Sequence, residues 1–268
     1  MKQLFESRAT DTPAPDVAMN EVLRGLLGRS SCRAYADRPV PPGTLQALAL
    51  AAQSAPSSSN LQCWSVVAVT DPGPKAALNA VSGQQRHVDE APVLLCFLAD
   101  LSRVETLADD AGMPTDSLAY LEMFLMAAID ASLAAQNLAT AAEAMGLGTC
   151  CIGGMRNDID TVGALLGLPR RVVPVFGMTL GYPDPARPAA VKPRLPTAAV
   201  LHLGRYRTDD LADQIRTYDQ RLAGFDREQG RPVAPWTQRS AERISDPARM
   251  QGRQDLLARL AARRLACR

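Results

Sequence analysis

Histidine is nearly absent from this chain of 268 residues, in which only His87 and His202 occur. They lie far apart in the sequence, so a zinc or iron site built on histidine ligands is not expected, and we predict no metal. The six cysteines lack the CxxC spacing of metal and redox motifs. In a chain of this length they indicate free thiols in a reducing cytoplasm rather than a disulfide framework.

The chain also lacks an excess of charge of either sign. Its 29 basic and 28 acidic residues leave a net charge of +1, which argues against nucleic acid or an anionic membrane surface as a partner. The N-terminal residues show no apolar segment of a secretory signal. The longest apolar stretch, residues 118–145, is interrupted by Glu122, Asp130, Gln136 and Asn137. It therefore indicates a buried helix rather than a membrane span.

Four common catalytic and nucleotide-binding signatures are missing. The sequence has no GxGxxG after a strand, no GxxxxGK[ST], no HExxH and no GxSxG. The dinucleotide-binding fold, the P-loop, the zinc protease helix and the nucleophile elbow therefore all lack their sequence motif. Chemistry in this chain must be carried by other segments.

What is present is a mixture of helical and strand patterns. Helices are predicted at residues 17–27, 44–54, 76–81, 118–145 and 157–166 and from 209 onward, with Asn157 as an N-cap. Strands are predicted at residues 64–70, 93–99, 172–181 and 198–203, and residues 149–152 form either a short strand or a turn. Because these elements do not alternate as regular βαβ units, we expect an α+β fold with helices around one sheet. We divide the chain into a flexible arm (1–16), a main domain (17–205) and a C-terminal helical extension of the same domain (206–268).

Two segments rich in polar or basic side chains precede the first predicted strand. Residues 29–33 read Arg-Ser-Ser-Cys-Arg, and two guanidinium groups with two hydroxyls suit a phosphate. Most such clusters, however, are solvated surface. Residues 55–64 place three serines, an asparagine and a glutamine between a helix and a strand. Rigid elements can present such a loop to a ligand, and a simple polar turn is the alternative.

Two further segments lie in the second half of the chain. Residues 146–157 close the long helix and then contain Gly153-Gly154. Glycines let a planar ring approach the backbone closely, or they serve only to end one element and begin another. In residues 191–196, Pro193 makes the chain extended, so that Lys192 and Arg194 face the same side. Two cations on one side can clamp an anion, whereas the alternative is a basic surface turn.

In this order and at these separations, the four segments resemble the flavin-dependent nitroreductase family. The resemblance is closest to its NADPH-preferring branch of oxygen-insensitive nitroreductases and flavin reductases. It rests on SxR at 31–33, SSSxLQC at 57–63, GLGxxxIGGxRN at 146–157 and KPRLP at 192–196. It implies a mostly antiparallel central sheet surrounded by helices, a long core helix, and a homodimer in which the C-terminal extension wraps the partner subunit.

The resemblance also implies an FMN site at the homodimer interface. Arg33 and Gln85 would reach the pyrimidine edge of the ring, where negative charge collects on reduction, and three serines would contact the ring and the ribityl chain. The backbone of residues 151–154 would lie against the ring, and Lys192 and Arg194 would hold the phosphate. The implied FMN contacts are Arg29, Ser30, Ser31, Arg33, Ser57, Ser58, Ser59, Gln85, Cys151, Ile152, Gly153, Gly154, Lys192 and Arg194.

Two positions depart from the family pattern. Ser30 stands where this branch usually has an arginine, and Arg29 lies one position earlier. Either Arg29 or the Ser30 hydroxyl then replaces one phosphate contact, or FMN binds less tightly. Cys151 stands where a relative has an aromatic residue, so we expect different packing against the ring there.

The function that the resemblance implies is that of an FMN-dependent oxidoreductase with ping-pong kinetics. NADPH would give a hydride to bound FMN, and a nitroaromatic, a quinone or a similar small molecule would then take the electrons. No catalytic side chain is expected, because the flavin carries the chemistry. Arg227 and Arg231 are expected to bind the 2′-phosphate of NADPH. Two alternatives remain: a flavin reductase that supplies reduced FMN to a partner monooxygenase, and a flavin-binding protein without rapid turnover.

Overall fold

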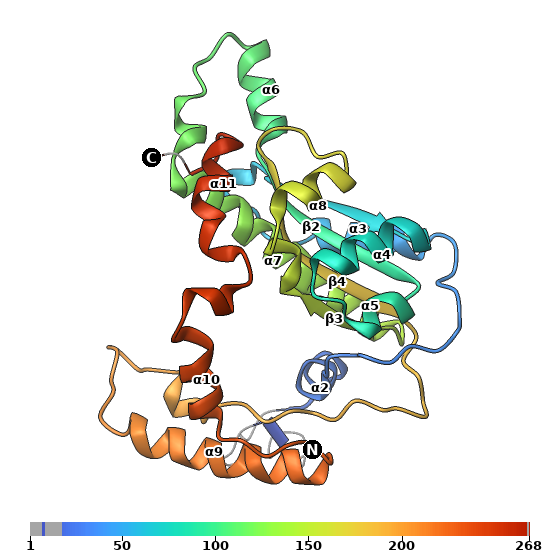
Figure 1. The fold of residues 1–268 in the computed structure, drawn as a ribbon, viewed down its shortest axis with the longest axis vertical. Coiled ribbons are helices and arrows are strands. Elements are labelled where there is room, and N and C mark those ends of the chain that lie inside the picture. Colours follow the sequence, from blue (N-terminus) through green and yellow to red (C-terminus); the bar gives the residue numbers. More distant parts are fainter. Residues whose placement is uncertain (1–6, 9–17, 267) are drawn as a thin grey trace. The chain divides into compact units, whose positions relative to one another are not determined.

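The computed structural model describes residues 7–8, 18–266 and 268 of the chain. They form two compact units, and each is described here by itself (Figure 1). The smaller unit comprises the described parts of residues 1–30 together with residues 189–249, and the larger comprises residues 31–188 and the described part of 250–268. The predicted arm at 1–16 lies outside the described residues except for Ser7 and Arg8. The predicted domain boundary after residue 205 falls inside the smaller unit and stays a prediction.

The larger unit is built around a four-stranded sheet. Its strands are β1 (Trp64–Val69), β2 (Val93–Asp100), β3 (Gly148–Ile152) and β4 (Val172–Gly181). They pair in the order β1-β2-β4-β3, and every pair is antiparallel. All eight residues of β2 are buried, because β2 is central and helices cover both of its faces. The predicted α+β fold with a mostly antiparallel sheet is thus confirmed.

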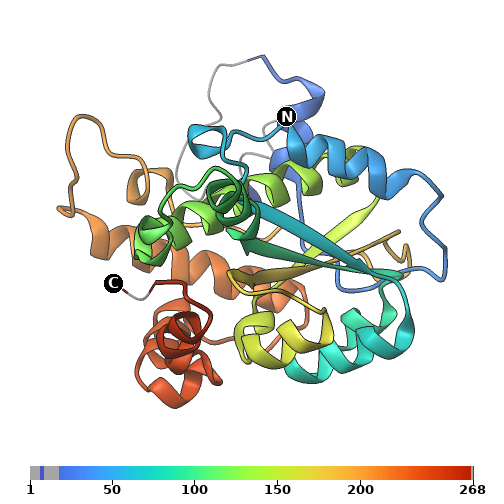
Figure 2. The same ribbon diagram turned by 90° about the horizontal axis from the view of Figure 1, so that it is seen from above.

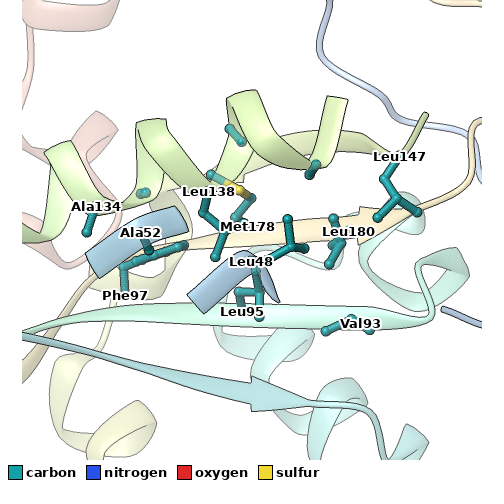
Figure 3. Packing of buried hydrophobic residues seen from close by; sticks show 13 residues of the cluster. Leu48, Ala52, Val93, Leu95, Phe97, Ala134, Leu138, Leu147, Met178 and Leu180 are labelled. Atoms are coloured by element: carbon teal, nitrogen blue, oxygen red, sulfur yellow. The ribbon is translucent and has the colours of Figure 1, made fainter. Parts of the chain in front are cut away.

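Helices lie on both faces of this sheet (Figure 2). One face packs against α3 (Thr44–Gln53) and α7 (Leu121–Ala144), where Leu95 and Phe97 of β2 meet Leu138 of α7 (Figure 3). The alternate residues of β2 point the other way, as strand geometry requires. That second face packs against α4 (Pro72–Val81), α5 (Arg86–Glu90) and α8 (Ile159–Leu165).

The long helix predicted at 118–145 is α7, and it is confirmed as an element of the core. Small side chains line its inner side, which allows it to lie close to the sheet. They are Ala127, Ala131, Ala134, Ala135, Ala139 and Ala142, all buried. Among the described residues, no helix combines the length and the apolar character needed to cross a bilayer.

The C-terminal residues divide between the two units. In the larger unit, α11 (Leu256–Ala262) packs its Leu260 into a cluster that also includes Leu118 and Ile159. The smaller unit contains α2 (Glu21–Gly28), α9 (Leu211–Glu228) and α10 (Trp236–Ile244). Its own small core consists of Tyr218, Leu222 and Phe225 of α9 with Trp236 packed against them.

Three local predictions differ from the structure. The strand predicted at 198–203 is wrong: a short 3₁₀-helix, Thr197–Ala199, is followed by irregular chain whose Leu203 is 82% exposed. An apolar run becomes a strand only beside another strand, and none pairs with it here. The N-cap of α8 is Asp158 rather than Asn157, because the Asp158 carboxylate accepts from the amides of Asp160 and Thr161. Helix α6 (Ser102–Asp110) was not anticipated.

Candidate functional site

The serine loop, residues 57–63, joins α3 to β1 in the larger unit. Ser57 Oγ donates to Asp130 Oδ2 at 2.7 Å, and the amide of Ser58 donates to Asp130 Oδ1 at 3.1 Å. Ser57 is half-buried, whereas the side chains of Ser58 and Ser59 are exposed. The loop therefore presents two hydroxyl groups outward from an anchored base, which is the arrangement that a ligand-binding loop requires.

The glycine segment, residues 151–154, comprises the last two residues of β3 and the two glycines after it, and it packs tightly against the end of α4. A Cβ added to Gly154 would overlap the carbonyl oxygen of Ser82 and lie 2.8 Å from its Cα. That same carbonyl accepts a 2.9 Å hydrogen bond from Gln85 Nε2. The structure thus brings Gln85 and Gly154, predicted as separate contacts, together at Ser82. Only glycine leaves room for this approach.

The other residues of the glycine segment alternate as strand geometry requires. Cys151 is exposed on the edge strand β3, and Ile152 is buried in the core. Two guanidinium groups lie near Gly153, one from the quoted motif and one that sequence reasoning missed: a Cβ there would be 3.7 Å from Arg156 Nη2 and 3.9 Å from Arg253 Nη1. Burial, and next the charge of Arg253, lower the pKa of Arg156. This end of β3 is therefore electropositive.

The segment with Ser31 and Arg33 lies alongside β3. The amide of Cys32 donates to the carbonyl of Thr149 at 2.9 Å, and Tyr35 Oη bonds to Thr179 Oγ1 at 2.7 Å. Ser31 is half-buried and Arg33 is exposed. These contacts hold Arg33 near the strand that leads into the glycine segment.

A buried imidazole lies next to Arg33. His87 is only 8% exposed, and its Nε2 has no hydrogen-bond partner among the residues that the structure describes. Burial, and next the charge of Arg33, lower the pKa of His87, while Glu90 acts in the opposite direction. A buried ring nitrogen without a partner is expensive. The His87 Nε2 atom is therefore available to a polar group of a ligand.

The remaining predicted phosphate contacts belong to the smaller unit. Arg8 joins their two segments: its guanidinium donates to the carbonyls of Leu27 and Arg29 and, at 3.1 Å, to that of Lys192. Arg29 and Ser30 are half-buried there. The amide of Arg194 in turn donates to the carbonyl of Arg8 at 3.0 Å. Arg8 therefore links Arg29 of the first segment to the fourth segment.

Cations gather around Lys192. Burial lowers the pKa of Lys192, and the charges of Arg239, Arg231 and Arg194 lower it further, while Asp226 opposes them. Asp226 is 1% exposed and forms an ion pair with Arg239 at 3.0 Å. Positive charges crowded in this way favour an anionic ligand.

The two arginines predicted for NADPH are placed differently. Arg227, in the last turn of α9, and Arg231, just beyond it, are both exposed. Arg231 lies 5.4 Å over the ring of Phe225 and acts on Lys192, as described above. Among the described contacts, Arg227 has no interaction with Lys192 or with the arginines around it.

Sequence reasoning missed three residues that hold these segments in place: Asp130, Asp226 and Arg8. Asp130 carried a usable signal, because it lies between Ala127, Ala131 and Ala134 on the buried side of a helix. A carboxylate in such a position is almost always paired. Asp226 and Arg8 carried none, since each acts on segments far away in the sequence.

Comparison with known proteins gives the same assignment. The nitroreductase family model matches residues 26–182, and the model of the family's C-terminal domain matches residues 192–268. A Bacillus subtilis protein named FMN reductase (NADPH) is 38% identical over 82% of this chain and 89% of its own. An oxygen-insensitive NADPH nitroreductase of Salmonella typhimurium is 38% identical over 77% of this chain and 83% of its own.

Solved structures agree in fold. A nitroreductase of B. subtilis superposes with a TM-score of 0.86 at 34% identity, over 92% of this chain and all of that one. The NADPH:FMN oxidoreductase of Vibrio harveyi, solved with NAD⁺, gives a TM-score of 0.83 at 34% identity, over 93% of this chain and all of that one. From its motifs, its fold and these matches, the chain belongs to the nitroreductase family.

Proposed function

We propose that this protein is an FMN-dependent oxidoreductase that takes electrons from NADPH and reduces small acceptors such as nitroaromatics and quinones. The observation that carries the proposal is the grouping of the predicted segments. In one unit, Gln85 and Gly154 meet at Ser82 and the segment with Arg33 pairs with β3, and in the other, Arg8 bonds to Arg29, Lys192 and Arg194. Relatives over most of the chain are named for FMN, NADPH and nitroreductase activity.

The residues present fit FMN. A phosphate suits the cations around Lys192, and a ring with hydrogen-bonding edges suits Gln85, Arg33 and the unpartnered Nε2 of His87. Gly153 carries no side chain, and the nearest groups to its Cβ position are the guanidinium groups of Arg156 and Arg253, which suit the electron-rich edge of a flat ring. When bound, FMN supplies the hydride chemistry, as flavins do.

The protein's own residues bind and orient. Arg33, Arg156 and Arg253 give the pyrimidine side a positive field, which stabilises the negative charge that develops on reduction. Lys192 and Arg194 hold the phosphate, with Arg29 or the Ser30 hydroxyl in the place of the usual arginine.

We assign the 2′-phosphate of NADPH to Arg231 and Arg227. The measurement is the ratio of kcat/KM for NADPH and NADH in the Arg231→Ala and Arg227→Ala variants. A KM for NADPH that rises in neither variant would contradict this assignment.

The exposed side of α7 supports a homodimer. Leu121, Leu125, Ile129 and Leu133 recur every four residues and are each between 39% and 57% exposed. The serine loop precedes β1 and the glycine segment ends β3, and these two strands are the opposite edges of the sheet, roughly 14 Å apart for three strand spacings. A second copy packed on α7 would cover the apolar stripe and could bring the loop of one copy to the glycine segment of the other.

A flavin reductase is the second candidate, because relatives carry that name as well. The two functions differ in the acceptor. Steady-state rates with NADPH and either free FMN or a nitroaromatic compound separate them: a higher kcat/KM for the nitroaromatic supports the first assignment. A rate that depends on free FMN alone would favour the second. Location in the cytoplasm remains a prediction.

A further inference from the structure

We propose that Asp130 is a positioning residue that shapes the serine loop for the flavin, and that Ser57 serves as its strut rather than as a flavin contact. This inference rests on the proposed function, since it concerns the loop that we assign to FMN. Asp130 lies on α7, 67 residues from Cys63 and outside all four motif segments.

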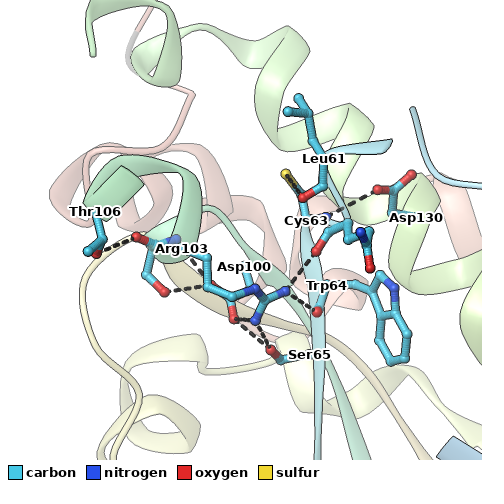
Figure 4. Close-up of polar contacts among 10 residues, drawn as sticks. Leu61, Cys63, Trp64, Ser65, Asp100, Arg103, Thr106 and Asp130 are labelled. Carbon is cyan, nitrogen blue, oxygen red and sulfur yellow. Dashed lines mark hydrogen bonds and ion pairs between the residues drawn. The ribbon is translucent and has the colours of Figure 1, made fainter. Parts of the chain in front are cut away.

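The Asp130 carboxylate binds both ends of the loop. At the start of the loop, it accepts from Ser57 Oγ at 2.7 Å and from the Ser58 amide at 3.1 Å. At the end, it accepts from the Cys63 amide at 3.2 Å (Figure 4). Asp130 is 2% exposed, so these bonds replace its hydration. Burial, and next Asp130, raise the pKa of the Cys63 thiol to about 11, which keeps this neighbour uncharged.

The loop between these ends has an unfavourable backbone. Ser59, Asn60 and Gln62 have φ angles of 48°, 55° and 52°. Side chains other than glycine adopt this left-handed region rarely, and such residues persist only where the surroundings hold them. An anchor at each end supplies that restraint.

Packing does not supply the restraint on the outer side. There the loop borders a cavity of about 550 Å³, lined by Asn60, Leu61, Gln62, Trp64 and Arg103 among others. Instead, Arg103 Nη2 donates to the carbonyls of Gln62 and Trp64 at 2.7 and 2.6 Å, and Asp100 fixes Arg103 at 2.8 Å (Figure 4). The loop is thus held by hydrogen bonds from both sides.

The same contacts occupy Ser57. Its hydroxyl donates its one hydrogen to Asp130 and accepts the Gln62 amide at 2.8 Å. The donor contacts to the flavin therefore fall to Ser58 and Ser59, whose side chains are exposed. Asp130 and Ser57 should act as one unit.

The test is a double-mutant cycle of Asp130→Asn and Ser57→Ala in the full-length protein, with two controls on α7. Glu122→Gln removes the same charge from an exposed position, and Leu138→Ala opens the core of the same helix. FMN affinity is measured by fluorescence titration of flavin-depleted protein, and stability by thermal unfolding. We expect Asp130→Asn to raise the Kd for FMN about tenfold or more, because charge-assisted bonds are lost.

Three outcomes decide. In the wild-type background, Ser57→Ala should raise the Kd for FMN. In the Asp130→Asn background, the same change should raise Kd by much less. Leu138→Ala should lower Tm and leave Kd within about twofold. If Asp130→Asn lowers Tm in the same way but leaves Kd unchanged, Asp130 is merely structural and the inference is wrong. If either Asp130→Asn or Ser57→Ala fails to fold, the Kd for FMN of the remaining variant, compared with that of Glu122→Gln and Leu138→Ala, still tests the inference.

A measurement without flavin separates this inference from the proposed function. Hydrogen exchange of the Ser58 and Cys63 amides in the flavin-free protein should speed up about tenfold or more in Asp130→Asn relative to Leu138→Ala. If exchange is faster in Asp130→Asn but the wild-type protein binds no FMN, the loop anchor is retained and the flavin assignment is rejected. If exchange is unchanged in Asp130→Asn and the wild-type protein binds FMN, the flavin assignment is retained and the loop anchor is rejected.

Discussion

At the scale of single residues, buried polar groups report most about function. His87 is buried with Nε2 unpartnered among the described residues, and Asp130 and Asp226 are buried carboxylates in helices. Each departs from the rule that interiors are apolar, and each lies beside a predicted contact. A pattern of apolar residues identifies the core, whereas these buried polar groups identify the segments that the core positions for ligand binding.

The pKa of His87 gives the first prediction. Burial and the charge of Arg33 lower it below its ordinary value of about 6.5, so the imidazole is neutral at pH 7. NMR titration of a His202→Gln variant would follow this single imidazole, and Arg33→Ala should raise its pKa. Because the folded pKa is the lower one, stability from this group is complete above about pH 6.5 and falls as the pH drops through the folded value. A pKa of 6.5 or higher would contradict the account.

The cation pair gives the second prediction. Changing both Lys192 and Arg194 to Ala should leave a folded protein that binds FMN about a hundredfold more weakly or worse, at about 1.5–3 kcal/mol for each charge-assisted contact. The control is a variant in which both Arg205 and Arg207 are changed to Ala. These two arginines are likewise two positions apart in the sequence, and both are exposed in the smaller unit. Equal flavin retention in the two double variants would place the phosphate elsewhere.

At the scale of elements, periodicity and burial determined what could be predicted. The strand at 172–181 matches β4 residue for residue, because a continuous apolar run in a central strand leaves no other choice. The run at 198–203 is also mostly apolar but pairs with no strand among the described residues. Helix α6 has a weakly apolar sequence with no buried residue, so its pattern gave little signal.

The turn after β3 gives a prediction at this scale. Gly154→Ala should displace the glycine segment from Ser82, because the new methyl group would overlap backbone rather than a flexible side chain. We expect a loss of about 1–3 kcal/mol in the free energy of unfolding, together with weaker FMN binding. Gly224→Ala is the control, since nothing lies within 4 Å of its Cβ position in α9, and alanine there should be neutral or stabilising. Both quantities follow from denaturant titration and flavin fluorescence.

At the scale of the whole molecule, the motif segments were predictable and their supports were not. The four segments carry local composition that suits a flavin. The fold joins the first to the fourth through Arg8 and sets it alongside β3, whereas the serine loop lies at the opposite edge of the sheet. Arg8 acts on Lys192 across 184 residues, and Asp130 acts on Ser57 across 73. The helical spacing shows that Asp130 is buried and must be paired, but the identity of its partner, like that of Arg8, depends on the folded chain.

The quaternary structure gives the prediction at this scale. Ile129 is 57% exposed in the middle of the apolar stripe on α7. Ile129→Glu would bury a charge in the proposed interface, and we expect light scattering to show a monomer that has lost its FMN. Leu107→Glu, at a 67% exposed position on α6, is the control and should remain a dimer. A wild-type protein that is monomeric with FMN bound would contradict the proposal.

The central claim, that this protein binds FMN and receives electrons from NADPH, is tested most directly by anaerobic reduction of the purified protein. The account predicts a yellow protein that releases FMN on heating. Its flavin absorbance should bleach within the turnover time when one equivalent of NADPH is added, and it should return on addition of a nitroaromatic compound. A colourless protein that takes up no FMN, or bound flavin that NADPH leaves oxidised, would contradict the account.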